Sequence, residues 1–556
     1  MTKSARVLGY VVWLAPLLAG SIACSAPPPE PRSAPDQAAP TPVQAQAQAK
    51  PQPGGTLVYT ISRTEATLHP LKGNRSDILR HVGLAYETLI AFDYRQDRDF
   101  RIDYNAVPWL AESWEQPDAK TYVFRLRRGV KWHDGVEFTA ADVAATFDWV
   151  IEERFSPADI LRQIQTVEQP DPYTLKVTLR EPSLGFLAGL ADQNTLIAPK
   201  HAIDAKFDFS KSAVGTGAFK LQSYQPNNDS RWVKHADYWQ SGRPYPDGAR
   251  QFYNLDQAAS TAAFVAGKAD LLASADKAEL DGVLKQRPDA RFLGQIAGYT
   301  LPLYLRVDRP PFNDVRVRRA MHLAVDRQAL LKTATFGEGS IDPPFVPGWR
   351  TGLALPQEEL LAMPGYRQPK DQDRAEAKRL LAEAGYANGL SFKLEYNSQG
   401  IAPPRIAVGV EPSLKAVGLN VELEPLETGL SNKREREGDF DAAAFVTVSD
   451  NFARLYEYNH SKGSMNSAHI ADPKLDQLID AFNAALTEAE RRRTAQEMQR
   501  YMLDQVYSIP TVNLAAFGLW QPWVKDYILS HGPVVRPIQA TVSRLWLDPA
   551  LLPKDR

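Results

Sequence analysis

The stretch 111–143 constrains the fold of this chain more than any other part of the sequence. Apolar and polar side chains alternate over 121–127, which is the pattern of a β-strand with one face on a core. An Asp-Gly pair at 134–135 then predicts a turn, and Thr139 followed three residues later by Asp142 has the spacing of a helix capping box. The stretch therefore predicts a strand, a turn and a capped helix, and it carries no catalytic motif.

Length and charge narrow the class of protein. A chain of 556 residues exceeds what one hydrophobic core usually organises, so two or three globular units are expected. The 64 basic and 66 acidic residues leave a net charge of -2, which gives no long-range attraction to nucleic acid. One cysteine excludes disulfides within the chain, and the nine histidines show no metal-ligand spacing. We expect no nucleic-acid partner, no metal site and no cofactor.

The first residues have the composition of an export signal. Lys3 and Arg6 precede an apolar run at 7–18, too short to span a membrane as a helix. The sequence Ser-Ile-Ala-Cys ending at Cys24 resembles a bacterial lipobox, although Leu usually stands where this chain has Ser21. We expect a signal peptide over 1–23, lipidation of Cys24 and a periplasmic or cell-surface protein anchored to the membrane. The alternative is ordinary signal cleavage nearby.

A Pro-, Ala- and Gln-rich segment follows at 24–54 and predicts a disordered tether, because it has too little apolar surface to offset the entropy of ordering. Strand and helix patterns then alternate through the rest of the chain, which favours an α/β fold. Strands are expected at 56–61, 174–179, 301–305, 392–396, 420–426 and 442–448, and helices at 77–91, 140–150, 376–384 and 488–503.

Within 111–143 the sequence Ala-Glu-Ser-Trp, the strand Phe-Arg-Leu-Arg-x-Gly-Val, the turn His-Asp-Gly and the helix start Phe-Thr-Ala-x-Asp-Val occur together. With these motifs the chain resembles the bacterial extracellular solute-binding proteins of ABC importers, family 5, the peptide, nickel and oligosaccharide group. The resemblance covers 55–547. Further matching stretches follow in the same order, at 215–221, 237–239, 311–319 with 324–327, 377–386, 415–421, 438–442 and 472–479.

The resemblance implies a two-lobed α/β fold of the periplasmic-binding-protein type, whose lobes close over a solute at a hinge. Lobe 1 would comprise 55–299 and 514–556, with an inserted subdomain at about 75–210, and lobe 2 would comprise 300–513. It also implies a monomeric binding protein, not an enzyme, that docks on the transmembrane subunits of an ABC permease.

Departures from the family pattern suggest where specificity lies. Arg306 stands where relatives commonly have Asn, and it could hold a carboxylate or phosphate of the solute bidentately; the alternative is a salt bridge to Asp308. Peptide-binding relatives receive the amino group on an aspartate that follows the Gly-Asp-Phe-Asp strand. Here Asp450, with Asn451 beside it, is either that acceptor or a loop cap.

Other candidate cleft residues are large side chains, for which burial in the core is the general expectation. They are Tyr304, Trp349, Trp520 and His69.

We expect the solute to be a short peptide or a peptide-like conjugate such as an opine. An oligosaccharide or a metal chelate is the alternative within the same fold. An exported hydrolase is the alternative from a different class, although no nucleophile motif stands out, and a sensor that reports solute to a membrane receptor also stays open.

Overall fold

The computed structural model describes residues 50–61, 67–72, 82–92, 106–155, 158–183, 185–191, 195–253, 255–296, 299–344, 352–398, 402–448, 453–485, 487–527 and 542–553. Residues 51–556 form one compact unit, separate from 1–50. The expected signal peptide, Cys24 and the tether up to residue 49 lie outside the described residues. None of the helices in the described part of the chain is both long and apolar enough to span a membrane.

An eight-stranded sheet has the order β12-β21-β11-β1-β10-β9-β8, with β15 paired to β21. Its central strands β10, β1 and β11 are parallel, so their carboxyl ends lie at one edge. The first strand occupies the range that the sequence predicts. The strands are β1 (Thr56–Ile61), β8 (Phe219–Gln225), β9 (Asp229–Lys234), β10 (Gly248–Tyr253), β11 (Leu271–Ala275), β12 (Arg291–Ile296), β15 (Gly339–Ser340) and β21 (Asn513–Trp520).

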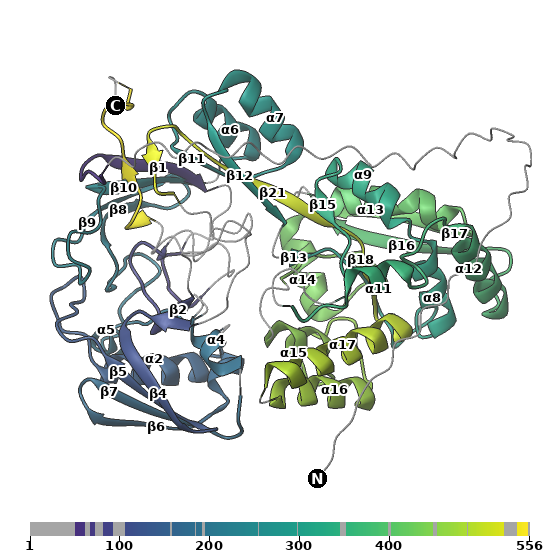
Figure 1. Ribbon diagram of the computed structural model, residues 1–556, viewed down its shortest axis with the longest axis horizontal. Coiled ribbons are helices and arrows are strands. Elements are labelled where there is room, and N and C mark those ends of the chain that lie inside the picture. Colours follow the sequence, from purple (N-terminus) through teal and green to yellow (C-terminus); the bar gives the residue numbers. More distant parts are fainter. Residues whose placement is uncertain are drawn as a thin grey trace, which may run out of the picture. The chain divides into compact units, whose positions relative to one another are not determined.

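Two helices accompany this sheet, α6 (Gln257–Val265) and α7 (Lys277–Gln286). Their apolar faces share a small core with β11 and β21 (Figure 1). A short pair, β22 (Val524–Lys525) and β23 (Trp546–Leu547), follows β21 in the chain.

Residues of the stretch 111–143 form part of a four-stranded antiparallel sheet with the order β4-β5-β7-β6. Thr139 and Asp142 form the expected capping box, and the backbone N–H of Thr139 donates to the Asp142 carboxylate at 2.8 Å. The strand and helix predictions here are confirmed. The elements are β4 (Ala111–Asp118), β5 (Thr121–Leu126), α2 (Ala140–Glu152), α3 (Ala158–Leu161), β6 (Ile164–Asp171), β7 (Thr174–Leu179), α4 (Gly185–Ala191) and α5 (Lys200–Asp204).

This small sheet consists of two similar hairpins. The sequence Glu-Gln-Pro-Asp ends both β4 (115–118) and β6 (168–171). The two strands have the same pattern of burial, and their pairings with β5 and β7 shift register at equivalent positions. The inner strands β5 and β7 pair antiparallel, so the second hairpin continues the sheet that the first one begins.

A five-stranded sheet with the order β17-β16-β18-β14-β20 organises the second half of the chain. Strands β16, β17 and β18 are parallel, whereas β14 is antiparallel to both of its neighbours. The strands are β14 (Leu303–Leu305), β16 (Leu390–Asn397), β17 (Leu419–Leu426), β18 (Ala442–Ala444) and β20 (Ser508–Ile509).

Helices pack around this sheet in two groups. The first group shares the core of the sheet and comprises α8 (Val315–Ala324), α9 (Arg327–Thr335), α11 (Gln357–Ala362), α12 (Asp371–Glu383) and α13 (Ala402–Lys415). The second group forms its own apolar cluster, beneath the sheet in Figure 1, and comprises α15 (Ala453–Asn459), α16 (Pro473–Ala484) and α17 (Glu488–Gln505). A further described helix is α14 (Thr428–Glu437).

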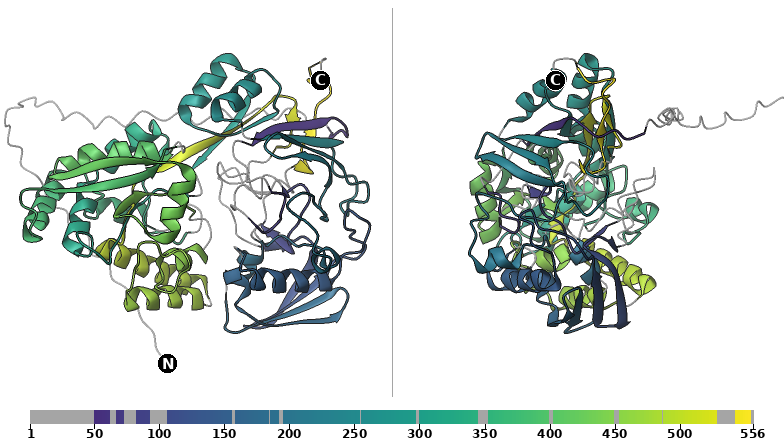
Figure 2. Two further views of the ribbon diagram at one scale, coloured as in Figure 1. Left: turned by 180° about the vertical axis from the view of Figure 1, so that it is seen from behind. Right: turned by 90° about the vertical axis from the view of Figure 1, so that its left-hand side faces the viewer.

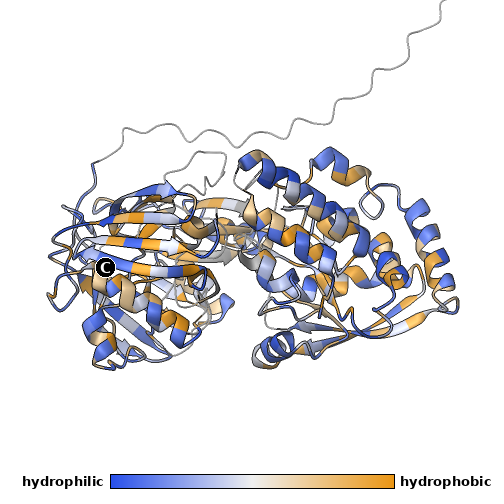
Figure 3. Cartoon of the chain, turned by 90° about the horizontal axis from the view of Figure 1, so that it is seen from below, coloured by the Kyte–Doolittle hydropathy of each residue, from blue (hydrophilic) through white to orange (hydrophobic). Residues whose placement is uncertain are grey.

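The views in Figure 2 show β21 leading from the five-stranded sheet into the eight-stranded one. It pairs with β15 at its first residues and with β12 and β11 further on. Along the strands and helices, apolar and polar positions alternate as expected for faces that contact a core on one side only (Figure 3).

Two predictions of secondary structure are wrong in part. Of the helix expected at 77–91, the described portion is helical only at residue 82, whereas 83–88 is non-helical and Ile90–Phe92 is strand β2, paired with β3 (Ala106–Pro108). The strand expected at 442–448 is divided into β18 and the separate β19 (Thr447–Val448), which pairs with β13 (Tyr299–Thr300). In both places a distant partner strand determines the backbone.

Candidate functional site

Ligands of open α/β sheets bind outside the carboxyl ends of parallel strands. In the eight-stranded sheet these ends belong to β1, β10 and β11, and in the five-stranded sheet they belong to β16, β17 and β18. The chain crosses between the sheets close to the second set of ends, because Leu303 of β14 pairs with Ala444 at the end of β18. This edge is the candidate functional site.

One ion pair brings the two sets of carboxyl ends together. Asp276 directly follows β11, and Arg405 lies in the first turn of α13, after β16. Arg405 Nη2 contacts Asp276 Oδ2 at 2.6 Å, and the two side chains are 28% and 15% exposed. The Arg405 guanidinium also lies 4.9 Å from the ring centre of Phe336, and its Nη1 has no hydrogen-bond partner in the described structure.

The five-stranded sheet contributes small polar groups at the same edge. Asn397 ends β16, and its Oδ1 accepts a hydrogen bond from Thr428 Oγ1 at 3.2 Å. Glu427 caps α14 through the backbone N–H groups of Gly429 and Leu430. The exposed side chain of Val446 lies just beyond β18. Amide, hydroxyl and apolar groups in one place suit a solute that combines polar and apolar parts.

The segments that cross between the sheets are tied to each other. Thr511 Oγ1 donates to the carbonyl of Leu301, which joins the outgoing and returning segments. Asn513 Nδ2 donates to Asp342 Oδ2 at 2.6 Å, and both residues are buried. The buried Arg327 donates to the carbonyl of Pro510 at 2.9 Å. The crossing is therefore an ordered part of the structure.

Arg306 lies at the opposite end of β14 from the crossing, where its backbone N–H donates to Asp441 beside the start of β18. Its Nε and Nη2 donate to the two carboxylate oxygens of Asp308 at 3.0 and 2.9 Å. The same guanidinium also donates to the carbonyl of Gly438 and contacts His469 Nδ1. The salt bridge that the sequence left as the alternative is thus present, and a contact between Arg306 and the solute stays a prediction.

Of two aromatic candidates, Tyr304 is buried and Trp520 is half-buried against a core. Tyr304 is 6% exposed, with its ring centre 6.0 Å from that of Phe445 and 6.4 Å from that of Tyr458. Trp520 ends β21 and pairs with Leu271, at the start of β11, so it lies at the edge of the sheet opposite to the carboxyl ends. Contact of Tyr304 and Trp520 with a solute stays a prediction.

His69 lies among three aromatic rings. Its ring centre is 5.0 Å from Trp149, 5.2 Å from Phe155 and 5.7 Å from Phe209. Burial lowers the pKa of His69 to about 4, and nearby Lys72 acts in the same direction. The imidazole is therefore neutral near pH 7. Its Nδ1 accepts the backbone N–H of Leu71 at 3.1 Å.

Three further candidates, Asp450, Asn451 and Trp349, lie outside the described residues. In the described portion of the chain, no group of three or more His, Cys, Asp or Glu side chains could hold a metal ion.

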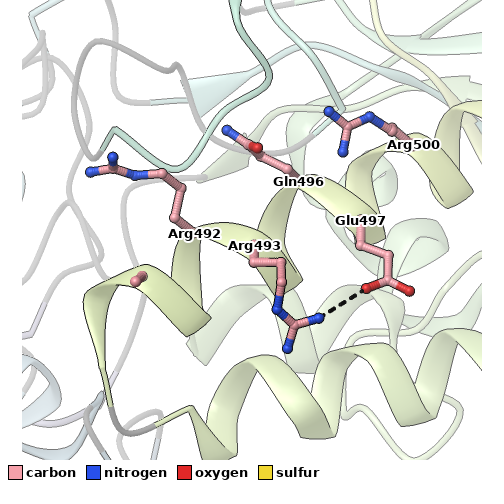
Figure 4. Close-up of a pocket in the computed structure, with 6 residues that line it drawn as sticks. Arg492, Arg493, Gln496, Glu497 and Arg500 are labelled. Carbon is pink, nitrogen blue, oxygen red and sulfur yellow. Dashed lines mark ion pairs between the residues drawn. The ribbon is translucent and has the colours of Figure 1, made fainter.

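A surface hollow of about 470 Å³ lies along α17 (Figure 4). Its charged side chains pair locally, Arg493 with Glu497 at 3.5 Å and Arg500 with Glu359 at 2.7 Å. One helix face alone provides its lining, so the carboxyl ends of the strands remain the better candidate. The lining residues are Ala489, Arg492, Arg493, Gln496, Glu497 and Arg500.

Residues 105–467 match the bacterial extracellular solute-binding proteins, family 5, middle region, over more than half of the chain. The chain belongs to this family. It is 26% identical over 460 residues to the periplasmic oligopeptide-binding protein OppA of Escherichia coli, covering 77% of this chain and 82% of the relative. It is also 26% identical over 470 residues to heme-binding protein A of Haemophilus influenzae, covering 76% and 82%.

The fold of this family 5 protein is the two-lobed α/β fold of the periplasmic binding proteins. The solved structure of the PBP AgaA from A. tumefaciens R10, in complex with agropinic acid, superposes with a TM-score of 0.74. It is 24% identical and covers 89% of this chain and 99% of that structure.

Two of the stretches that carry the family resemblance, 215–221 and 237–239, meet at one buried carboxylate, Glu87. Trp109 Nε1 and the Tyr238 hydroxyl donate to one oxygen at 2.9 and 2.8 Å. The Thr216 hydroxyl and Trp239 Nε1 donate to the other at 2.8 and 3.0 Å. Burial raises the pKa of Glu87 to about 7, against the effect of these four donors. These two stretches are therefore structural.

The His-Asp-Gly turn is structural as well, as expected for an Asp-Gly turn. His133 Nδ1 accepts the backbone N–H of Gly215 at 3.3 Å, and its Nε2 lies 3.0 Å from the carbonyl of Gly217. Burial lowers the pKa of His133 to about 3, which keeps the ring neutral. The turn thereby fixes the position of the Gly-Thr-Gly stretch at 215–217.

Sequence reasoning missed Arg405, Asp276 and Asn397 as residues at the candidate site. A usable signal was present for Asn397 and Arg405, because the strand expected at 392–396 is followed by a loop and a helix, and the carboxyl end of such a strand is where this fold binds ligands. No comparable signal marked Asp276, because no strand was predicted immediately before it.

Proposed function

We propose that this protein is the solute-binding receptor of an ABC importer, which captures a short peptide or a peptide-like, opine-like solute and delivers it to the permease without chemical change. The observation that carries the proposal is the family 5 match over 105–467, together with the likeness to an oligopeptide-binding relative. The mixed polar and apolar groups at the strand ends support the same class of solute. Closure of the lobes would exclude water and strengthen each polar contact.

The deciding experiment is isothermal titration calorimetry on the purified mature protein. The panel contains dipeptides, tripeptides, agropinic acid, maltooligosaccharides and haem. We expect binding of peptides or agropinic acid, and recovery of the bound molecule unaltered by mass spectrometry. Binding of oligosaccharides with no response to peptides would contradict the proposal. Hydrolysis of a bound peptide would instead support the exported hydrolase.

A metal chelate is the second candidate, because one relative is a heme-binding protein of similar identity. Haem binding without peptide binding in the same panel would favour it.

For the solute contacts we propose Asp450 as the acceptor of an amino group and Arg306 as the holder of an anionic group. Around them we propose Asn451, Tyr304, Trp349, His69 and Trp520. Asp450→Asn should weaken binding of a free-amino peptide about tenfold or more, and should spare an N-acetylated one, because a charged hydrogen bond is lost. Arg306→Ala should weaken the binding of anionic solutes, because the variant lacks the guanidinium that holds the anionic group. Unchanged affinity with the fold intact would remove Arg306 from the site.

We also propose export, with a lipid anchor at Cys24 and the lobe limits 55–299 with 514–556 and 300–513. The apolar run at 7–18 and the lone cysteine support the anchor. Cys24→Ser should move the protein from the membrane fraction to the soluble fraction without changing solute affinity. A wild-type protein that fractionates as soluble would contradict the anchor.

A further inference from the structure

The ion pair between Arg405 and Asp276 joins the two lobes directly. Asp276 belongs to the lobe of the eight-stranded sheet, and Arg405 lies on α13, which packs on the five-stranded sheet. Among ion pairs whose two partners both belong to the described part of the chain, this is the only one that connects the two sheets' lobes. All the others join residues of the same lobe.

The geometry of the pair favours a stable contact. Asp276 Oδ1 accepts the backbone N–H of Glu279 at 2.8 Å and caps α7. This hydrogen bond holds the carboxylate in place independently of Arg405. The N-terminus of α7 also favours a negative charge at this position. Asp276 Oδ2 is then free to face Arg405 Nη2 at 2.6 Å. On the other side, the Phe336 ring supports the guanidinium.

The ion pair lies next to the segments that cross between the lobes, close to β21. The lobes are connected through the crossing segments, which Thr511 and Asn513 hold together by hydrogen bonds. Arg405 and Asp276 are not part of those segments. A rotation about these segments that moves Arg405 away from Asp276 breaks the ion pair, whereas the hydrogen bonds within the segments need not break. The ion pair therefore distinguishes the two arrangements of the lobes energetically.

We propose that Arg405 and Asp276 form a latch between the lobes, which stabilises the closed arrangement and sets how readily the protein opens. The proposal deepens the proposed function, because opening controls the entry and release of solute. Both side chains keep contact with solvent, 28% and 15% exposed, so salt can weaken their attraction.

The test uses the full mature protein without solute, so its outcome does not depend on which solute the protein binds. Arg405→Gln removes the charge, and Asp276→Asn removes the charge but keeps a residue that can cap α7. Small-angle X-ray scattering gives the ratio of open to closed molecules. Each variant should raise this ratio about tenfold, and the double variant should add little to either single change.

Arg500→Gln is the matched control, because it breaks a bidentate ion pair with Glu359 inside one lobe. It should leave the ratio of open to closed molecules unchanged. Raising NaCl from about 0.1 M to about 1 M, which shortens the screening length from about 10 Å to about 3 Å, should open the wild type but not the double variant. Identical scattering of Arg405→Gln, Asp276→Asn and the wild type, with all three folded by circular dichroism, would overturn the latch. Equal opening by Arg500→Gln would overturn it as well.

Discussion

Glu87 joins two of the family motifs through hydrogen bonds. Its carboxylate is fully buried and accepts hydrogen bonds from four side chains that lie up to 152 residues away in the sequence. No positive charge is among these four donors. The ionised form is therefore costly, which is why the pKa of Glu87 rises to about 7.

This raised pKa predicts a specific dependence of stability on pH. The folded protein holds the proton more strongly than the unfolded chain, whose pKa is near 4.5. The stabilisation is therefore complete below about pH 4.5 and is lost as the pH rises through about 7. Relative to Glu87→Gln, which cannot titrate, the wild type should lose roughly 2 to 3 kcal/mol of unfolding free energy between about pH 5 and about pH 8.

Urea unfolding of both proteins across this pH range measures the difference. Glu112→Gln, at an exposed position on β4, is the control and should follow the wild type at every pH. A constant gap between wild type and Glu87→Gln would show that Glu87 does not titrate in this range.

The residues that share Glu87 could not be paired from the sequence. Thr216, Tyr238 and Trp239 were recognisable as parts of motifs, but a motif gives the spacing of residues along the chain and not their partners across it. Arg306 illustrates the same limit. Its salt bridge to Asp308 could be proposed because the two are neighbours, whereas its contacts with Gly438 and His469 depend on the fold.

At the scale of elements, the two hairpins β4–β5 and β6–β7 are a repeated unit. Asp118 accepts the backbone N–H groups of Lys120 and Thr121, and Asp171 accepts that of Tyr173. These contacts form the turns, because an aspartate side chain can bond to the backbone two or three residues on. Asp118 and Asp171 thus stabilise the turns of the two hairpins in the same way.

We therefore expect Asp118→Ala and Asp171→Ala to lower the thermal midpoint by similar amounts, about 1 to 2 °C each, because one exposed turn is lost in each case. Asp118→Asn should retain most of the stability, since its amide oxygen can still accept. Differential scanning calorimetry measures all three. A large effect at one aspartate and none at the other would show that the hairpins are not equivalent.

The patterns that predicted elements best were those with local causes. The capping box and the strand at 174–179 were predicted at their observed positions, because spacing and alternation act within a few residues. The helix at 77–91 was not. Val82, Ala85, Tyr86 and Leu89 are buried as the helical spacing predicted, but the chain there turns around Glu87 and ends in β2. The apolar spacing therefore predicted which side chains are buried, but not the conformation of the backbone.

At the scale of the whole molecule, the two lobes meet at β21. Its first residue, Asn513, pairs with Ser340 of β15, and its side chain donates to the buried Asp342. Asn513→Ala would leave that carboxylate with one donor fewer. We expect a loss of about 1 to 3 kcal/mol in unfolding free energy and faster hydrogen exchange at the start of β21.

Hydrogen exchange followed by mass spectrometry resolves this effect. Asn420→Ala, at an exposed position on β17, should change neither the exchange of β21 nor the stability. If β21 exchanges at the same rate in Asn513→Ala as in the wild type, the Asn513 side chain does not restrain the crossing.

The candidate site belongs to this scale, which explains why little of it was predicted. The family resemblance gave the two lobes and their order in the chain. The positions that face each other, Asp276 and Arg405, are brought together only when both sheets are complete and placed side by side. Alternation within one strand contains no information about that placement.

The place of β21 in its sheet also has a consequence for the order of folding. It is an interior strand, hydrogen-bonded between β12 and β11, yet it follows all of the five-stranded sheet in the chain. During synthesis or translocation, the eight-stranded sheet cannot close until the other lobe has already emerged. The lobe that begins the chain is thus the last to be finished, and until then its unpaired inner edges at β11 and β12 are where a chaperone would be needed most.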